Sequence, residues 1–218
     1  MKVEVLRMRR RLVAVGLPAA VVVCLAIGIL YGARDAPGTG VTPTDPGRIA
    51  LGHVSWAKWY PHLESLVNGH STVIVGEVQA SDMETPREGF THHTVKVLQV
   101  VKGDLEPGDI ITVSQTGGIH TLLTGERTYY ELEDDPLMRP GEKSLLFLNG
   151  PTTQKVVSDK VVYLGTSPQT RFIIDGGRVF WMGDVFKDRR IPRISNELMW
   201  MNGRRLDTVL TRLKEIAS

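Results

Sequence analysis

The stretch 71–118 constrains the fold of this chain most, because it holds three strand-like runs separated by clear turn signals. The first run, 73–75, consists of three consecutive β-branched residues, which is typical of a strand covered on both faces. The second run, 94–101, alternates polar and apolar residues at its start and then becomes apolar on both faces. The third run, 110–113, is again rich in β-branched residues. We therefore expect three β-strands.

A loop at 102–109 joins the second and third runs and contains two glycines, one proline and two aspartates. This composition predicts an antiparallel hairpin. The apolar second half of the run 94–101 has two explanations. One is a bent strand shared between two sheets, as in a small barrel, and the other is a bulge near Gln99.

The N-terminal segment 12–33 contains no charged residue and has about the length that a helix needs to cross a bilayer. Clustered arginines precede it, so the positive-inside rule places the N-terminus in the cytoplasm and the rest of the chain outside. A signal peptide would need small residues at its cleavage site, and Tyr31 does not fit. We therefore expect an uncleaved anchor rather than a cleaved signal.

These features divide the chain into four parts. Residues 1–11 form a basic cytoplasmic tail, 12–33 a transmembrane helix, 34–48 a flexible linker rich in Pro, Gly and Thr, and 49–218 an extracytoplasmic domain. The expected localisation is therefore the cell membrane, with a single pass and the main domain outside the cytoplasm.

The net charge of +2 is distributed unevenly along the chain. Residues 1–35 hold six basic and two acidic residues, so the remainder holds 20 basic against 22 acidic residues and carries −2. A near-neutral outer domain argues against nucleic acid as a partner. The only cysteine, Cys24, lies in the apolar run, so the outer domain has no disulfide, which is ordinary for a bacterial protein.

Helical spacing occurs at both ends of the outer domain. Apolar residues in 60–67 predict a short helix that begins near Tyr60 and stops at Asn68-Gly69. Near the C-terminus, the apolar residues of 206–216 repeat at helical spacing, which predicts an amphipathic helix docked on its own chain. The alternative partner for this helix is the same helix in a second copy.

The segment between the first hairpin and the C-terminal helix predicts further strands, at 128–132, 144–148 and 161–165. The residues 171–182 predict a hairpin with a tight Gly turn, whose buried face holds Phe172, Ile174, Val179 and Trp181. The acids at 131–135 lack the spacing of a calcium loop, so we expect a solvated acidic loop. The segment 184–201, with Arg189, Arg190 and Arg193, is expected to cross the surface. The fold class is mainly β (α+β).

The order of these features resembles that of bacterial membrane-anchored extracytoplasmic proteins of unknown function. The corresponding segments read HLESLVNGHSTVIVGEV, VKVLQVVKGDLEPGDIITVSQTGG, RPGEKSLLFL, RFIIDGGRVFWM and RRLDTVLTRLKEIA. The resemblance covers most of 60–217 and implies a small antiparallel β-barrel of the netrin and metalloprotease-inhibitor (TIMP) type, a relative of the OB-fold. Such inhibitors act through an N-terminal cysteine that this domain lacks, so the resemblance implies a fold and no activity.

The sequence predicts no catalytic, cofactor-binding or metal-ligating residue. Adjacent strand residues point to opposite faces, so His92 and His93 are not expected to share a metal, and we expect the histidines to be scattered on the surface. No zinc-binding motif or nucleophile elbow occurs, and Ser71, Ser114 and Ser144 lack a His-Asp signature nearby in sequence, although a triad of distant residues stays open.

The expected function is non-enzymatic binding of a protein or ligand at the cell surface, and the partners are the membrane, through the N-terminal helix, and an envelope or surface protein. The alternative is a cell-envelope hydrolase or a protein resembling a protease inhibitor, with an unrecognised site. The oligomeric state stays open.

Overall fold

The computed structural model describes residues 48–52, 58–83, 89–121, 124–153, 161–165, 167–187, 189 and 191–218. The predicted transmembrane helix 12–33, the tail 1–11 and the linker up to residue 47 lie outside the described residues. No helix within these described ranges is long and apolar enough to span a bilayer.

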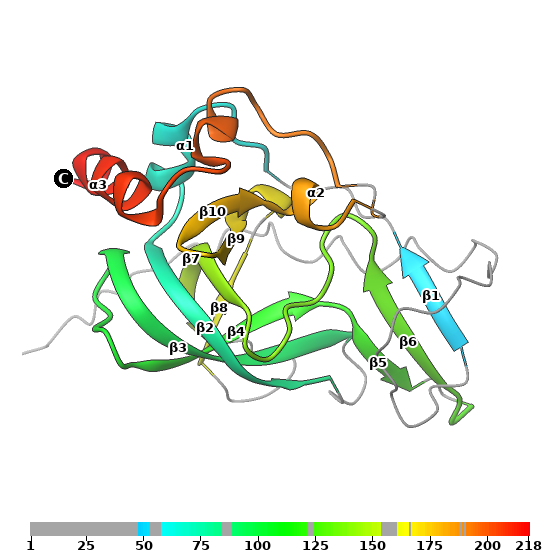
Figure 1. The fold of residues 1–218 in the computed structure, drawn as a ribbon. Helices are drawn as coiled ribbons and strands as arrows, with labels where there is room; N and C mark the ends of the chain where they lie inside the picture. The colour runs from blue at the N-terminus through cyan, green and yellow to red at the C-terminus, as the bar shows by residue number, and fades with distance from the viewer. Residues whose placement is uncertain are drawn as a thin grey trace, which may run out of the picture. The chain divides into compact units, whose positions relative to one another are not determined.

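Five strands form a closed barrel (Figure 1). They are β2 (Thr72–Asp82), β3 (Phe90–Lys102), β4 (Ile110–Thr116), β7 (Lys143–Thr153) and β8 (Val161–Leu164). Around the barrel the order is β2, β3, β4, β8 and β7, which pairs again with β2. The β4–β8 pair is parallel and the others are antiparallel. The predicted hairpin across 102–109 and the prediction of a mainly β barrel are confirmed.

Two smaller groups of strands lie outside the barrel: one continues the barrel sheet and the other forms a separate sheet. β9 (Arg171–Asp175) pairs with β7, and β10 (Arg178–Trp181) pairs with β9, so both continue the barrel sheet. A separate sheet contains β1 (Arg48–Gly52), β6 (Arg127–Leu132) and β5 (Gly118–Thr121), in which β1 and β6 run parallel. The predicted strands at 128–132, 144–148 and 161–165 therefore correspond to β6, β7 and β8.

The helices are few and short apart from the last. They are α1 (Leu63–Asn68), η1 (Pro168–Thr170), α2 (Met182–Val185), η2 (Leu198–Met201) and α3 (Leu206–Ala217), where η denotes a 3₁₀ helix. The segment 184–201, expected to cross the surface, includes part of α2 and all of η2, and its residues Ile194, Leu198 and Met201 are buried.

The first helix begins later than the predicted start at Tyr60. The Tyr60 N–H donates to Oε1 of Gln169 at 2.6 Å, and Nε2 of Gln169 donates back to the Tyr60 carbonyl at 2.9 Å. This pair of bonds engages the backbone of Tyr60 with η1, so the helix starts at Leu63 instead. The predicted stop is confirmed, since Gly69 caps the helix and its N–H donates to the Ser65 carbonyl.

Two apolar cores lie on the two sides of the barrel wall. The inner core fills the barrel with side chains that include Ile74, Val95, Val113 and Leu146. The outer core lies between the outer face of β2, β7 and the β9–β10 hairpin on one side and α1, η2 and α3 on the other. Consecutive residues of β2 therefore face different cores, which confirms that 73–75 is covered on both faces.

The second half of β3 has the bulge that the sequence left open as one explanation, and the strand belongs to one sheet rather than two. Its register against β2 shifts at two places, between partners of Val97 and Gln99 and between partners of Val100 and Lys102. Leu98 and Val101 pack partly buried against the outer core, and Val100 packs against the inner core. The strand is therefore bulged and contacts both cores.

The two late elements pack as predicted. Phe172, Val179 and Trp181 are buried in the outer core, and Ile174 packs partly buried beside them. The tight turn is formed by Gly176 and Gly177, which both have positive φ. Helix α3 buries one face against α1, β3 and β10 of its own chain. The hairpin register and the docking of the helix on its own chain are confirmed.

Candidate functional site

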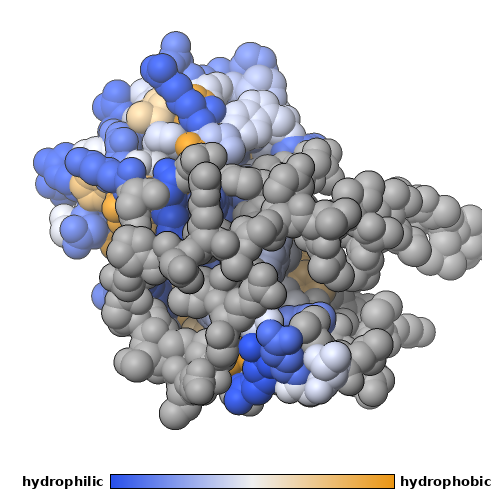
Figure 2. Space-filling view, turned by 90° about the vertical axis from the view of Figure 1, so that its right-hand side faces the viewer, coloured by the Kyte–Doolittle hydropathy of each residue, from blue (hydrophilic) through white to orange (hydrophobic). Residues whose placement is uncertain are grey.

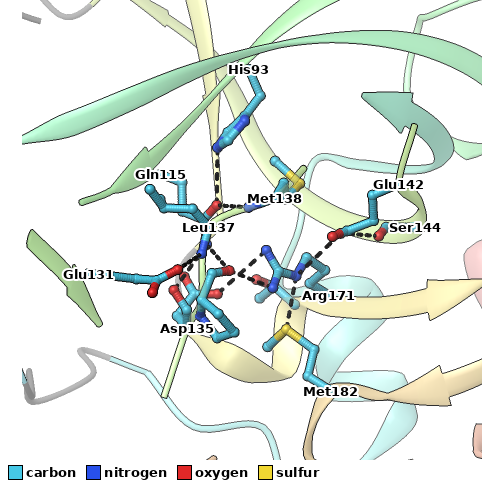
Figure 3. A network of polar contacts seen from close by, with 12 residues as sticks. His93, Gln115, Glu131, Asp135, Leu137, Met138, Glu142, Ser144, Arg171 and Met182 are labelled. Atoms are coloured by element: carbon cyan, nitrogen blue, oxygen red, sulfur yellow. Dashed lines mark hydrogen bonds and ion pairs between the residues drawn. The ribbon is translucent and has the colours of Figure 1, made fainter. Parts of the chain in front are cut away.

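A buried polar network closes one end of the barrel, where β3 begins, β4 ends and β7 begins (Figure 3). The connection between β6 and β7 covers this end of the barrel. Met138 from this connection is buried in the inner core. We call the polar residues around it, which are His93, Gln115, Glu131, Asp135, Glu142, Ser144, Arg171 and Arg189, the barrel-end network.

Arg171 is the central cation of the network and is only 4% exposed. Its Nη2 donates to the Pro136 carbonyl at 2.6 Å, and its Nε lies 2.8 Å from the sulfur of Met182. Two carboxylates face it, Asp135 at 4.0 Å from Nη1 and Glu142 at 3.8 Å from Nε. Burial of a guanidinium is costly unless it is paired, so these groups together allow the charge to stay inside.

The acids at 131–135 extend the network. Glu131 is 6% exposed, accepts a bond from Arg189 Nη2 at 2.7 Å and accepts another from the Leu137 N–H at 2.9 Å. Asp134 is also buried. The prediction of a solvated acidic loop is therefore wrong, because two arginines from distant segments, Arg171 and Arg189, pair with these acids. Nothing in the spacing of the acids along the chain indicates those partners.

Gln115 fixes the orientation of the neighbouring histidine. Its Nε2 donates to the carbonyls of Asp135 and Pro136, at 3.2 and 3.0 Å, so its Oε1 must face the other way. This Oε1 accepts the Met138 N–H at 3.0 Å and lies 3.1 Å from Nε2 of His93. The imidazole therefore carries its proton on Nε2 and donates it to Gln115.

The other ring nitrogen of His93, Nδ1, is then an acceptor, and the Ser81 hydroxyl donates to it at 2.8 Å. A serine hydroxyl on an imidazole resembles part of a hydrolytic triad. However, burial, assisted by the nearby Arg171 charge, lowers the pKa of His93 to about 3. A general base needs a pKa near the working pH, so the Ser81–His93–Gln115 chain is suited to holding the barrel end together.

Asp135 has a pKa shifted in the opposite direction. Burial raises it to about 6, although Arg171 and the Gln115 hydrogen bond lower it and the neighbouring acids Asp134 and Glu142 raise it further. The carboxyl thus keeps its proton to a higher pH than an exposed aspartate does. The network accordingly holds two groups whose ionisation burial opposes.

A second row of polar residues lies on the opposite face of the same strands. Asp82, His92 and Ser114 are direct neighbours across β2, β3 and β4. Ser114 and His92 are both 4% exposed, and no hydrogen bond joins the Ser114 hydroxyl to any residue in the described part. The sequence left a triad of distant residues open, and this row brings such residue types together without a hydrogen bond between serine and histidine.

The prediction that the histidines are scattered on the surface is wrong for three of them. His70, His92 and His93 are all buried, at 1%, 4% and 0% exposure. The signal was their position, since His92 and His93 stand in a strand whose pattern continues into buried valines. His62 is exposed, and His53 lies outside the described residues. Among the described residues, no three His, Cys, Asp or Glu side chains gather closely enough to hold a metal ion.

Two grooves mark the surface beside the β9–β10 hairpin. The first, about 750 Å³, is lined by apolar and acidic residues that include Phe180, Val185 and Asp184. The second, about 550 Å³, is lined by Arg178, Trp200, Arg204 and Arg205 together with small polar residues, and we call it the arginine groove. On the face shown in Figure 2, the described residues are mostly hydrophilic, with only small hydrophobic areas.

The arginine groove holds exposed charged groups in a defined geometry. Arg204 lies over the ring of Trp200, 4.7 Å from its centroid, and its Nε donates to the Trp200 carbonyl at 2.6 Å. Arg178 Nη1 donates to the Gly203 carbonyl at 2.7 Å. Each guanidinium has five N–H donors, so each keeps donors for a ligand. The arginines that the sequence singled out, at 189–193, are different ones, and nothing local in the sequence indicated this set.

Comparison with known proteins assigns no family. No protein-family model matches the chain, and no curated protein matches it significantly. The function therefore has to be inferred from the geometry of this molecule.

Proposed function

We propose that this protein is a non-enzymatic binding module, anchored in the cell membrane by 12–33 and displayed outside the cytoplasm, that binds an envelope component through the arginine groove. The observation that carries the proposal is the placement of Arg178 and Arg204. Both are exposed, both are anchored to backbone carbonyls, and neither pairs with a carboxylate in the described part of the chain.

The contacts at the barrel end also support a binding role for the arginine groove rather than for the barrel end. Its polar groups bond to one another and to the backbone of 135–138, and the inner core fills the space between the strands. Side chains engaged in this way hold the fold together, so the groups with spare hydrogen-bonding capacity at the surface are better candidates for binding. This contrast favours binding over the alternative of an envelope hydrolase.

We also propose that the barrel is of the netrin and TIMP type. The barrel order β2, β3, β4, β8, β7 with a parallel β4–β8 pair is consistent with the Greek-key arrangement of an OB-like barrel. It supports the resemblance to netrin and TIMP domains, whose inhibitory cysteine this domain lacks. OB-like barrels serve many binding functions, so the fold supports binding without naming a ligand.

Two measurements test the proposal. For the location, protease is added outside intact cells that carry the full chain with a C-terminal tag. Cleavage within 34–48 and release of a soluble tagged fragment is expected, because this linker lies between the anchor and the domain. Digestion only after lysis would show that the orientation is wrong.

For binding, the full chain in lipid nanodiscs is sedimented with isolated cell-envelope polymers. Co-sedimentation that saturates with protein concentration is expected, with empty nanodiscs as the control. Failure to sediment above that control would contradict a binding role.

A further inference from the structure

The arginine groove contains an arrangement that ordinary folding does not favour. Arg178 and Arg205 are partners in an antiparallel bridge, so two like charges stand directly opposite each other. Such pairs are destabilising across strands. Arg204 stands next to Arg205 in the chain and lines the same groove. Departures from local rules without a structural gain are expected at functional sites.

Nearby acids offset this charge only in part. Asp207 pairs with Arg205, with Nη2 to Oδ2 at 2.9 Å. Asp175 is the strand partner of Arg178 in the β9–β10 hairpin, but no ion pair joins the two. Arg178 and Arg204 therefore keep their charge available to the groove.

The backbone fixes the direction of these guanidinium groups. The Val179 N–H donates to the Arg204 carbonyl at 2.9 Å, and the Gly203 N–H donates to the Val179 carbonyl at 2.7 Å. The segment carrying Arg204 is thereby fastened to β10, which carries Arg178. Trp200 supports the guanidinium of Arg204 from below. An anionic ligand would meet donors that are already placed, which reduces the entropy cost of binding.

We propose that the arginine groove binds an acidic polysaccharide, whose carboxylates pair with Arg178 and Arg204 and whose sugar rings lie along the surface beside Trp200. This inference rests on the proposed function, since it names the ligand of the same groove. Guanidinium groups match carboxylates in geometry. Trp200 is partly exposed and lines the groove, with the Arg204 guanidinium over its ring, so uncharged sugar rings would lie beside this pair.

The net charge of the chain outside the groove favours polyanions with widely spaced charges over densely charged ones. The chain beyond residue 35 carries −2, so outside the groove the domain as a whole does not attract a negative ligand. A densely charged polymer, such as polyphosphate or nucleic acid, would be attracted to the groove but repelled by the net negative charge of the rest of the domain. A polysaccharide with charges separated by uncharged rings avoids that repulsion.

The test measures binding of the full chain in nanodiscs of neutral lipid to three polymers by tryptophan fluorescence and calorimetry. The probes are oligogalacturonate, neutral dextran and inorganic polyphosphate. Oligogalacturonate should bind, more weakly as salt rises, and dextran should not. Arg178→Gln and Arg204→Gln should each weaken binding roughly tenfold, since each removes a hydrogen bond to a charged group. Arg193→Gln, an exposed arginine outside the groove, is the matched control.

Each other outcome overturns the inference. Equal affinity of the groove variants and the wild type would place binding elsewhere, and tighter binding of polyphosphate would exclude a polysaccharide as the class. If oligogalacturonate fails to bind while isolated envelope polymers still sediment with the protein, the ligand class is wrong and the binding function stands. If neither binds, both proposals fail. Circular dichroism checks that every variant folds.

Discussion

Arginine is used in two opposite ways in this molecule. Arg171 is buried at the barrel end, where two carboxylates, a carbonyl and a sulfur surround it. Arg178 and Arg204 are exposed beside each other, each held by a single carbonyl. A buried charge with inward partners serves stability, whereas we propose that exposed charges held near like charges bind an external ligand. The predictions below test this difference.

The largest effect is expected at the buried cation. Arg171→Met removes the positive charge that faces Asp135 and Glu142, and so leaves buried carboxylates without their partner. We expect the free energy of unfolding to fall by about 3–5 kcal/mol, measured by urea denaturation.

The control is Arg193→Met at an exposed site, which should change stability by about 0.5 kcal/mol or less. A change of that small size at Arg171 as well would show that the network does not support the fold. Partial recovery in Arg171→Met combined with Glu142→Gln would sharpen the assignment to charge.

A substitution at Trp181 tests the packing of the outer core. Its side chain is buried in the outer core, and its ring approaches Gly183 closely. Trp181→Ala should cost about 3–5 kcal/mol in thermal or urea unfolding, because it leaves a large cavity. Trp59→Ala, at a residue that is 45% exposed, is the matched control and should melt near the wild type. Equal effects of the two substitutions would contradict the outer core as described.

The pH dependence of stability separates the two ionisable groups of the barrel end. The pKa of Asp135 is raised to about 6 from its usual 3.8, so its contribution to stability falls as pH rises through that window. The pKa of His93 is lowered to about 3 from its usual 6.5, so the unfolded chain binds the proton first and the contribution of His93 rises with pH. These two slopes oppose each other in the wild type.

Asp135→Asn removes the decrease in stability with rising pH that Asp135 causes. The stability of this variant should therefore rise more steeply than that of the wild type between about pH 4 and 6, in urea unfolding at a series of pH values. His93→Gln should give the reverse, with stability that falls over the same window. Parallel curves for wild type and Asp135→Asn would show that Asp135 ionises normally.

A smaller effect is expected from the serine that donates to His93. Ser81→Ala removes one hydrogen bond between neutral groups and should cost about 0.5–1.5 kcal/mol in urea unfolding. Binding of envelope polymers should not change, because the serine lies outside the arginine groove. Ser81→Thr keeps the hydroxyl and serves as control. Loss of binding in Ser81→Ala alone would move the functional site to the barrel end.

The sequence predicted the strands of the barrel because their signals are local. The β-branched run 73–75, the loop 102–109 and the Gly176-Gly177 turn act through backbone propensity and face alternation. The same reasoning predicted the buried face of α3 correctly. The start of α1 was predicted too early, because Gln169, more than a hundred residues away, bonds to the Tyr60 backbone.

The candidate site was not predictable in the same way. Arg171 is the first residue of β9 and Arg178 the first residue of β10, and no local signal shows that one is buried and the other exposed. Whether an arginine is buried depends on which distant segments pack against it. The bridge between Arg178 and Arg205 likewise joins residues whose closeness only the fold creates.

The most direct test of the two uses of arginine is the stability of the ligand-free protein after removal of one charge from the like-charged bridge. Arg178→Gln relieves the repulsion from Arg205, so we predict a slightly higher melting temperature together with weaker binding of oligogalacturonate. Arg178→Lys keeps the charge and should show no gain in melting temperature. A lower melting temperature for Arg178→Gln than for the wild type, with unchanged binding, would show that Arg178 serves the fold and would contradict the central claim.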